Sequence, residues 1–235
     1  MRIIRVPIAP LYMINAFVIS TDSGAVIVDT GLPGMAGKFH AALASDGKDW
    51  SDVKLIIVTH AHVDHAGAAA RLRQLTGAPI LAHQADRLYY NHTKQIHYCP
   101  TGPFGRLFKA TGLAAAPYDA FEADIELAGF EQFSLREFGI EGHVEFTPGH
   151  TEGSLSVLLD NGNALVSDLV ASGILLGGII RLKHPKRPPF EDDPRLVADQ
   201  LQRLIDNGST HFHIGHGATL GSTQISQHIQ RLRRL

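Results

Sequence analysis

The chain has 235 residues, of which 44% are hydrophobic and 19% are charged, as in an ordinary folded globular protein. A formal net charge of −2 gives no electrostatic reason to expect a nucleic-acid partner. The one cysteine, Cys99, excludes an internal disulfide and a thiolate metal cage, and it favours a reducing, cytoplasmic location.

The first residues do not read as a signal peptide, because Pro7, Pro10 and Asn15 interrupt their apolar stretch. No later apolar window is long enough to span a bilayer, so we expect no membrane partner. Short runs rich in valine, isoleucine and phenylalanine predict strands at residues 15–20, 25–29, 54–59, 79–83, 132–138, 143–147, 154–160, 164–168 and 211–215. Amphipathic windows and glycine stops predict helices at residues 34–47, 65–77, 193–208 and 223–235.

These strands outnumber what one sheet comfortably holds, and helices flank them. We therefore expect an α/β protein with two sheets and helices outside, a four-layer αββα sandwich. The sequence shows no internal repeat and no Gly/Ser-rich linker, which favours a single domain over residues 1–235. Residues 88–122 and 171–192 fit no element, and loops of this length usually cover a functional site.

The stretch "VTHAHVDHAG" (58–67) follows the apolar run "KLIIV" and crowds four donor side chains together, namely His60, His62, Asp64 and His65. Neutral imidazoles and a carboxylate supply nitrogen and oxygen donors, and their crowding favours a bound cation. The plain alternative is a polar loop that is rich in histidine.

Three further donors stand at strand ends, where side chains from distant segments can converge. His150 lies in the turn "TPGHTEGS" between two predicted strands. Asp168 ends the strand 164–168, and His216 follows the strand 211–215. Together with the first stretch, these side chains predict a metal centre.

Taken in order, H-x-H-x-D-H (60–65), His150, Asp168 and His216 resemble the ligand set of metallo-β-lactamase-fold hydrolases. The resemblance covers about residues 2 to 220 and includes "VDTG" (28–31). It implies two divalent metal ions, with zinc the first choice and iron or manganese the alternatives. The implied roles are these: His60, His62 and His150 bind the first metal, Asp64, His65 and His216 bind the second, Asp168 bridges the two, and Asp29 accepts a hydrogen bond from a ligand imidazole.

The implied activity is that of a dinuclear metal-dependent hydrolase, in which a metal-bound hydroxide cleaves a small acyl substrate such as a thioester, ester or lactone. Asp64 would be catalytic, because it would handle a proton as well as bind metal. Lactam-hydrolysing relatives generally lack a carboxylate where this chain has Asp168, and many acyl-homoserine lactonases have a tyrosine where it has Ala171. The alternatives are a phosphodiesterase-type hydrolase and a single-iron oxidoreductase that resembles persulfide dioxygenases.

The segment "RLKHPKRPP" (181–189) carries four basic side chains and no acid, namely Arg181, Lys183, Lys186 and Arg187. Such a run is usually a solvated loop, but beside a metal site it would steer or clamp an anionic small-molecule substrate. The apolar residues 169–180 just before it are expected to line a pocket, cover the site or meet a second copy in a homodimer. Aromatic residues of the other long segment would form the opposite wall, namely Tyr89, Tyr90, Phe104 and Phe108.

Overall fold

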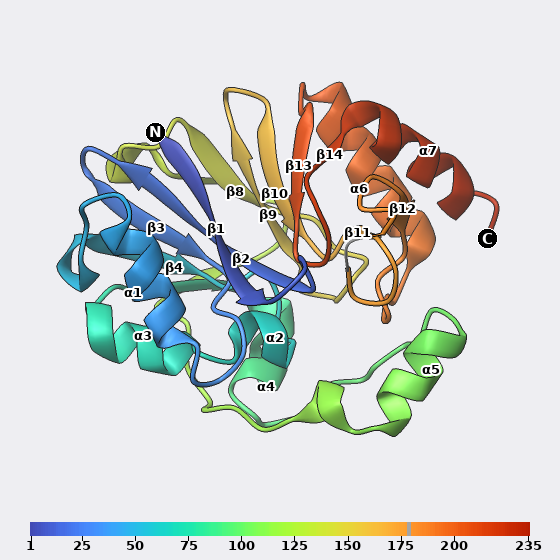
Figure 1. Ribbon diagram of the computed structural model, residues 1–235, viewed down its shortest axis with the longest axis horizontal. Coiled ribbons are helices and arrows are strands. Elements are labelled where there is room, and N and C mark those ends of the chain that lie inside the picture. The colour runs from blue at the N-terminus through green and yellow to red at the C-terminus, as the bar shows by residue number, and fades with distance from the viewer. Residues whose placement is uncertain (178–179) are drawn as a thin grey trace.

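Two six-stranded β-sheets pack against each other in the computed structural model, which describes residues 1–177 and 180–235 (Figure 1). The strand order in the first sheet is β1 (Arg2–Ala9), β2 (Ile14–Thr21), β3 (Gly24–Val28), β4 (Val53–Ile57), β5 (Ile80–His83) and β6 (Ile125–Leu127). The order in the second is β14 (Leu220–Gly221), β13 (His211–Ile214), β10 (Asn163–Ser167), β9 (Leu155–Leu159), β8 (Gly142–Phe146) and β7 (Phe133–Ser134). A short ribbon pairs β11 (Ala171–Ser172) with β12 (Pro185–Lys186).

Helices cover the outer face of each sheet (Figure 1). The first sheet is covered by α1 (Ala36–Ala44) and α3 (Ala69–Thr76), and the second by α6 (Pro194–Asp206) and α7 (Ser222–Leu232). The remaining helices are α2 (Val63–Ala66), α4 (Arg87–Tyr90) and α5 (Pro103–Ala110), with 3₁₀ turns at Trp50–Asp52, Gln84–Asp86, Leu113–Ala115 and Arg136–Phe138. This arrangement confirms the predicted four-layer αββα sandwich. Within the described ranges, no helix has the length and apolar character needed to cross a bilayer.

Three apolar layers hold the sandwich together, and β4 shows how one strand serves two of them. Ile56 packs into the core beneath α1 and α3, whereas Leu55 and Ile57 pack between the two sheets. Because both faces of β4 are covered, its sequence is a nearly continuous apolar run rather than an alternating one. The third layer packs the second sheet against α6 and α7.

The single helix predicted at 65–77 is in fact two helices, α2 and α3, with a break at Gly67 and Ala68. A Cβ atom on Gly67 would lie 2.3 Å from the carbonyl oxygen of Val63 and 2.8 Å from that of Gly31. The backbone at Gly67 therefore sits directly against a neighbouring loop, and the chain turns there. As a result, Asp64 and His65 lie on a separate short helix just beyond β4.

Other elements also differ from the sequence expectations. The strand predicted at 132–138 covers only β7, because residues 136–138 form a 3₁₀ turn. β1 was not predicted, and it tolerates Pro7 because it is an edge strand. Of the two unassigned segments, 88–122 contains α5 and 171–192 contains the β11–β12 ribbon. Residues 178–179 of the second segment, within the apolar stretch 169–180, lie outside the described residues.

Asn15, in β2, ties the first sheet to the loop that follows β13 in the second. Its Nδ2 donates to the carbonyl oxygen of Ile214 at 3.1 Å and to that of Gly217 at 2.9 Å. Its backbone N–H donates to the carbonyl oxygen of Gly215 at 2.8 Å. Asn15 is buried, so these three bonds replace the hydration that the loop carbonyls lose on folding. The loop is the one that carries His216.

Replacing Asn15 by alanine should lower the free energy of unfolding by about 2–4 kcal/mol, because two buried carbonyl groups lose their donor. Chemical denaturation measures the change. Asn207→Ala is the matched control, since Asn207 is exposed just after α6. If the two variants unfolded at the same denaturant concentration, Asn15 would not be the tie between the sheets.

Candidate metal centre

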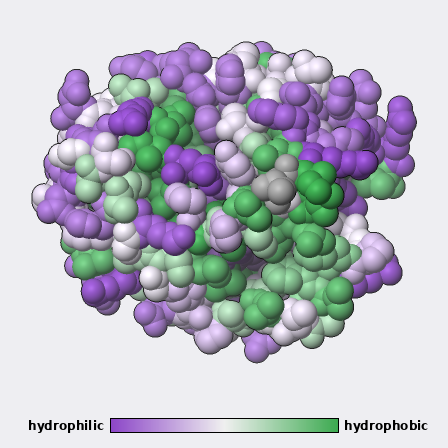
Figure 2. Space-filling view, in the orientation of Figure 1, coloured by the Kyte–Doolittle hydropathy of each residue, from purple (hydrophilic) through white to green (hydrophobic). Residues whose placement is uncertain are grey.

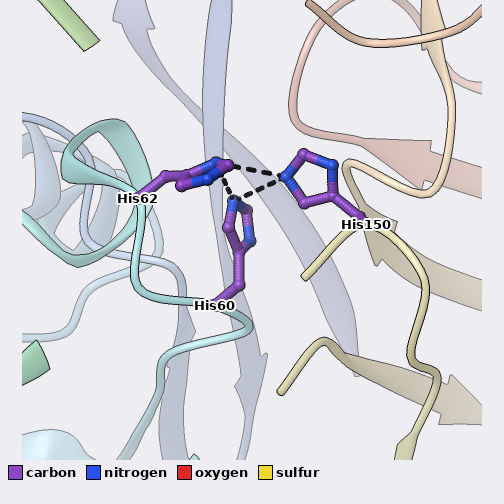
Figure 3. Close-up of side chains that lie close together, drawn as sticks. All are labelled: His60, His62 and His150. Carbon is purple, nitrogen blue, oxygen red and sulfur yellow. Dashed lines mark hydrogen bonds between the residues drawn. The ribbon is translucent and has the colours of Figure 1, made fainter. Parts of the chain in front are cut away.

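The rings of His60, His62 and His150 point their nitrogen atoms at one another (Figure 3). Nε2 of His60 lies 3.1 Å from Nδ1 of His62 and 3.1 Å from Nε2 of His150, and the latter two atoms are 3.2 Å apart. A neutral ring nitrogen either carries a proton or accepts one, so three of them in a triangle cannot all be hydrogen-bonded in pairs. At least one pair would be two donors or two acceptors. These three histidines form the first group. A cation bound between them would remove the conflict.

The size and protonation of the first group suit a transition metal. Tetrahedral zinc holds nitrogen ligands at about 2.0–2.1 Å, which places neighbouring ligand atoms about 3.3 Å apart. The observed spacings of 3.1 and 3.2 Å are close to that value. Burial lowers the pKa of His62 to about 3 and that of His150 to about 4, and it holds the pKa of His60 well below its usual value. All three imidazoles are therefore neutral at neutral pH, as metal binding requires.

Asp64, His65 and His216 form the second group, and Asp168 lies between the two groups. Nε2 of His216 is 3.2 Å from Oδ2 of Asp64 and 3.1 Å from Oδ2 of Asp168. Asp168 also approaches Nε2 of His65 at 3.5 Å and, in the first group, Nε2 of His150 at 3.8 Å. Nε2 of His65 and Oδ1 of Asp168 are buried, yet neither has a hydrogen-bond partner in the described part of the chain. Two cations, one in each group, would satisfy these atoms and would share Asp168.

The second group differs from the first in its charge. Burial would lower the pKa of His65, but Asp168, Asp29 and Asp64 outweigh that effect and raise it to about 9. Burial would also lower the pKa of His216. The carboxylates of Asp168 and Asp64 outweigh burial and raise this pKa well above its usual value. Burial would raise the pKa of Asp64 and of Asp168, but the two imidazoles hold both well below their usual range. In the metal-free protein, protons on two histidines thus balance the carboxylates, and a divalent cation would replace them.

Asp29 lies behind the second group and orients the ring of His65. Its Oδ2 accepts from Nδ1 of His65 at 2.8 Å and from the hydroxyl of Ser167 at 2.9 Å. Its Oδ1 accepts from the backbone N–H and the hydroxyl of Thr59, at 2.9 and 2.8 Å. A proton held on Nδ1 leaves Nε2 of the ring as the atom that faces the cluster. The carbonyl oxygen of Met13 orients His216 in the same way, 2.5 Å from its Nδ1.

Two non-glycine residues in this network have a left-handed backbone. Asp29 has a φ of 61° and Ser167 a φ of 46°, a region that side chains other than glycine seldom adopt. Asp29 follows β3 in the first sheet, and Ser167 ends β10 in the second. A strained backbone of this kind persists only where the surrounding contacts hold it in place, and such residues cluster at functional sites. Here the hydrogen bond between the two side chains joins the sheets directly behind the second group.

Asp86 is a buried carboxylate that no sequence pattern indicated, and it holds two of the histidine-bearing loops together. Its Oδ2 accepts from the backbone N–H of Ala61 and from the hydroxyl of Thr151, both at 3.0 Å, and its Oδ1 accepts from the backbone N–H of Gly153 at 2.8 Å. Burial raises the pKa of Asp86 to about 6 in spite of these donors. The only available signal was its place just after the predicted strand 79–83, at the edge of the sheet where the other polar residues gather.

A cavity of about 290 Å³ opens over both groups. His62, Asp64, His150, Asp168 and His216 line one side of it. The other walls are apolar or aromatic and include Ile14, Leu32, Tyr98, Phe108, Leu113, Leu176 and Phe190. Both unassigned segments, 88–122 and 171–192, contribute to these walls, so they do lie beside the site.

The four basic side chains suggested for substrate binding do not line this cavity within the described ranges. Lys183 donates to the carbonyl oxygen of Thr219 at 2.6 Å, and Lys186 donates to that of Leu175. Arg187 pairs with the buried Glu191, and Arg181 is exposed. The charged ends of three of these side chains are thus engaged by other groups, and nearness to Asp168 along the chain does not bring them to the metal centre.

The suggested aromatic wall is likewise only partly in place. Phe108 lines the cavity, whereas Tyr90 is buried in the core beneath the first sheet. Tyr98, which was not singled out, stacks on the ring of His62 with the ring centres 5.0 Å apart, and its hydroxyl donates to the carbonyl oxygen of Ala114 at 2.5 Å. Tyr98 therefore links the wall of the cavity to the first group.

Several known proteins are similar to this chain over nearly its whole length. The probable metallo-hydrolase YflN of Bacillus subtilis is 27% identical over 229 residues, which cover 91% of this chain and 82% of that protein. The metallo-beta-lactamase fold-containing protein ST1585 of Sulfurisphaera tokodaii is 24% identical and covers 93% of this chain and 78% of its own length. The crystal structure of the BLEG-1 B3 metallo-beta-lactamase superimposes with a TM-score of 0.71 at 22% identity, over 98% of this chain and 99% of that one.

The sequence pattern of the family agrees with the geometry. It matches residues 9–173, which include both groups except His216 as well as the linking Asp168. The αββα sandwich, the donor clusters at its strand ends and this match lead to one conclusion: the chain belongs to the metallo-beta-lactamase superfamily.

Proposed function

We propose that this protein is a dinuclear metal-dependent hydrolase that cleaves a small acyl substrate, namely a thioester, an ester or a lactone. The observation that carries the proposal is the pair of donor groups that approach each other at Asp168 and open onto one cavity. The name of the Bacillus subtilis relative, a probable metallo-hydrolase, supports the reaction class.

The donor set fits two divalent ions. Zinc is the first choice because imidazole nitrogens dominate, and iron or manganese are the alternatives. Structural zinc sites are closed by four ligands around one ion, whereas here the two donor groups share Asp168 and both open onto the cavity, which leaves room for water or substrate. When bound, such ions supply a nucleophilic water of lowered pKa and polarise the carbonyl group of the substrate.

Asp64 is the side chain best placed to move a proton. Its side chain is 22% exposed, against 3% for His216 and for Asp168, and it lines the cavity. It faces the space that a substrate would occupy, so its carboxylate can accept a proton from a group bound there. In this role Asp64 takes a proton from the attacking water and returns it to the leaving group.

The proposal is tested by a screen of the purified, metal-loaded protein against thioesters, lactones, aryl esters and phosphodiesters, repeated after chelation. We expect hydrolysis of acyl substrates and its loss with the chelator. Cleavage of phosphodiesters alone would identify a phosphodiesterase instead. Oxygen consumption with a persulfide, together with one iron per chain, would identify the oxidoreductase alternative.

Replacing Asp168 by alanine should abolish turnover and reduce the bound metal from about two ions per chain to about one or fewer, because a shared ligand is lost. Elemental analysis after gel filtration measures the metal, and the substrate found in the screen measures turnover. A variant that kept both ions and its activity would show that Asp168 does not link them.

Replacing Gly215 by alanine should displace side chains of the metal centre, because the added methyl group would clash with them. A Cβ atom there would lie 2.2 Å from Oδ1 of Asp168 and 2.6 Å from Cε1 of His65. We expect Gly215→Ala to lose activity by about 10²-fold, since a misplacement of roughly 1 Å can cost that much. Gly37→Ala is the matched control, because a Cβ atom on Gly37 meets nothing within 4 Å. Equal activity of the two variants would contradict the assignment.

Filling the second group should release about two protons per chain at pH 7, because the raised pKa values of His65 and His216 keep both rings protonated in the metal-free protein. Metal affinity should therefore rise as the pH rises. Calorimetric titration with zinc in two buffers of different ionisation enthalpy measures the protons. The His216→Ala variant should release about one proton fewer. If the heat of zinc binding were the same in both buffers, no protons would be released and the prediction would be wrong.

A further inference from the structure

We infer that the cavity selects substrates whose acyl part is an uncharged, apolar chain of short to medium length. This inference rests on the proposed function, since it names the substrate class of the same site. It differs from the expectation of an anionic substrate that the basic segment 181–189 suggested.

The walls of the cavity carry the inference. Ile14 and Leu32 approach from the first sheet and the loop after it, Leu176 follows the strand β11, and Phe108, Leu113 and Phe190 come from the segments that cover the site. The acidic side chains among the described lining residues are Asp64 and Asp168, and the histidines are His62, His150 and His216; all five belong to the donor cluster. No lysine or arginine from the described ranges lines the cavity.

Against the walls away from the donor cluster, a carboxylate at the far end of an acyl chain would lose its hydration without gaining a cationic partner. An apolar chain gains instead from every methylene group that it buries against the walls. The wall chemistry therefore favours neutral chains and opposes anionic ones.

The surface around the cavity is apolar as well. Leu113 on the wall is 64% exposed, and Ile174 and Leu175, just before Leu176, are 47% and 55% exposed. Figure 2 shows hydrophobic residues gathered on the face that carries α5. An apolar chain would thus meet apolar side chains at the rim of the cavity as well as inside it.

The volume of the cavity sets how much of a chain the walls can bury. About 290 Å³ equals the share of liquid volume of about ten water molecules. This space is at the lower end of the range for ligand pockets, so it suits a short or medium chain better than a long fatty acyl chain.

The test uses thioesters of N-acetylcysteamine, which share one neutral leaving group. From acetyl to hexanoyl, we expect kcat/KM to rise by up to about fourfold per added methylene, the factor that full burial of that group gives. Dodecanoyl should gain no comparable factor per methylene over hexanoyl, because its outer methylene groups extend beyond the cavity walls. The adipoyl thioester, which ends in a carboxylate, should react at least about a hundredfold more slowly than the heptanoyl thioester of similar length.

A pair of variants distinguishes the effect of a charge on the cavity wall from the effect of a charge elsewhere on the surface. Leu113→Lys adds a cation to the wall and should raise the adipoyl rate relative to the heptanoyl rate by about tenfold. Leu107→Lys makes the same change at a 68% exposed residue that is not among the lining residues of the cavity, and should leave this ratio unchanged. Equal effects of the two substitutions would overturn the inference.

The remaining outcomes distinguish this inference from the proposed function. If heptanoyl and adipoyl thioesters reacted equally well, the enzyme would be an acyl hydrolase and the selectivity would be wrong. If only phosphodiesters were cleaved, the proposed function itself would fall. Calorimetric binding of octan-2-one and of 6-oxoheptanoate, ketones that carry the same two chains and cannot be hydrolysed, tests the cavity without turnover. Equally tight binding of the two ketones would overturn the inference as well.

Discussion

The structure depends on a set of buried nitrogen and oxygen donors that cannot satisfy one another. Three neutral imidazoles of the first group face each other, and the carboxylates of Asp64 and Asp168 lie against two further histidines. Such an arrangement is costly in a low-dielectric interior unless protons or cations compensate it. A divalent cation would compensate these donors most directly, because several of them can coordinate one cation at once.

The scaffold holds these donors in place through hydrogen bonds between distant segments. Asp29 and Ser167 join the two sheets behind His65, and each of them has a left-handed backbone. Asp86 joins the loop of His60 and His62 to the loop of His150 through backbone and hydroxyl groups. Because each tie joins segments of both sheets, the packing of one sheet on the other sets the positions of the donors.

The donor cluster and the cavity have different origins in the fold. Donors stand at the ends of strands, where the sheets make their positions rigid. The apolar walls come largely from the irregular segments 88–122 and 171–192, which lie outside the sheets. A fold that serves many reactions leaves the substrate to such segments, so the chemistry of the walls decides specificity.

The sequence by itself determined the layer architecture and the seven donors, because strand periodicity and the chemistry of metal ligands are local and leave a visible pattern. Tertiary structure alone decided the roles of Asn15 and Asp86, whose partners lie up to 202 and 67 residues away along the chain. Tertiary structure also decided that Lys183 and Lys186 bind backbone carbonyl groups and that Arg187 pairs with Glu191. It placed the ring of Tyr98 against that of His62. These contacts join backbone groups and side chains that no spacing brings together, so only the packed chain reveals them.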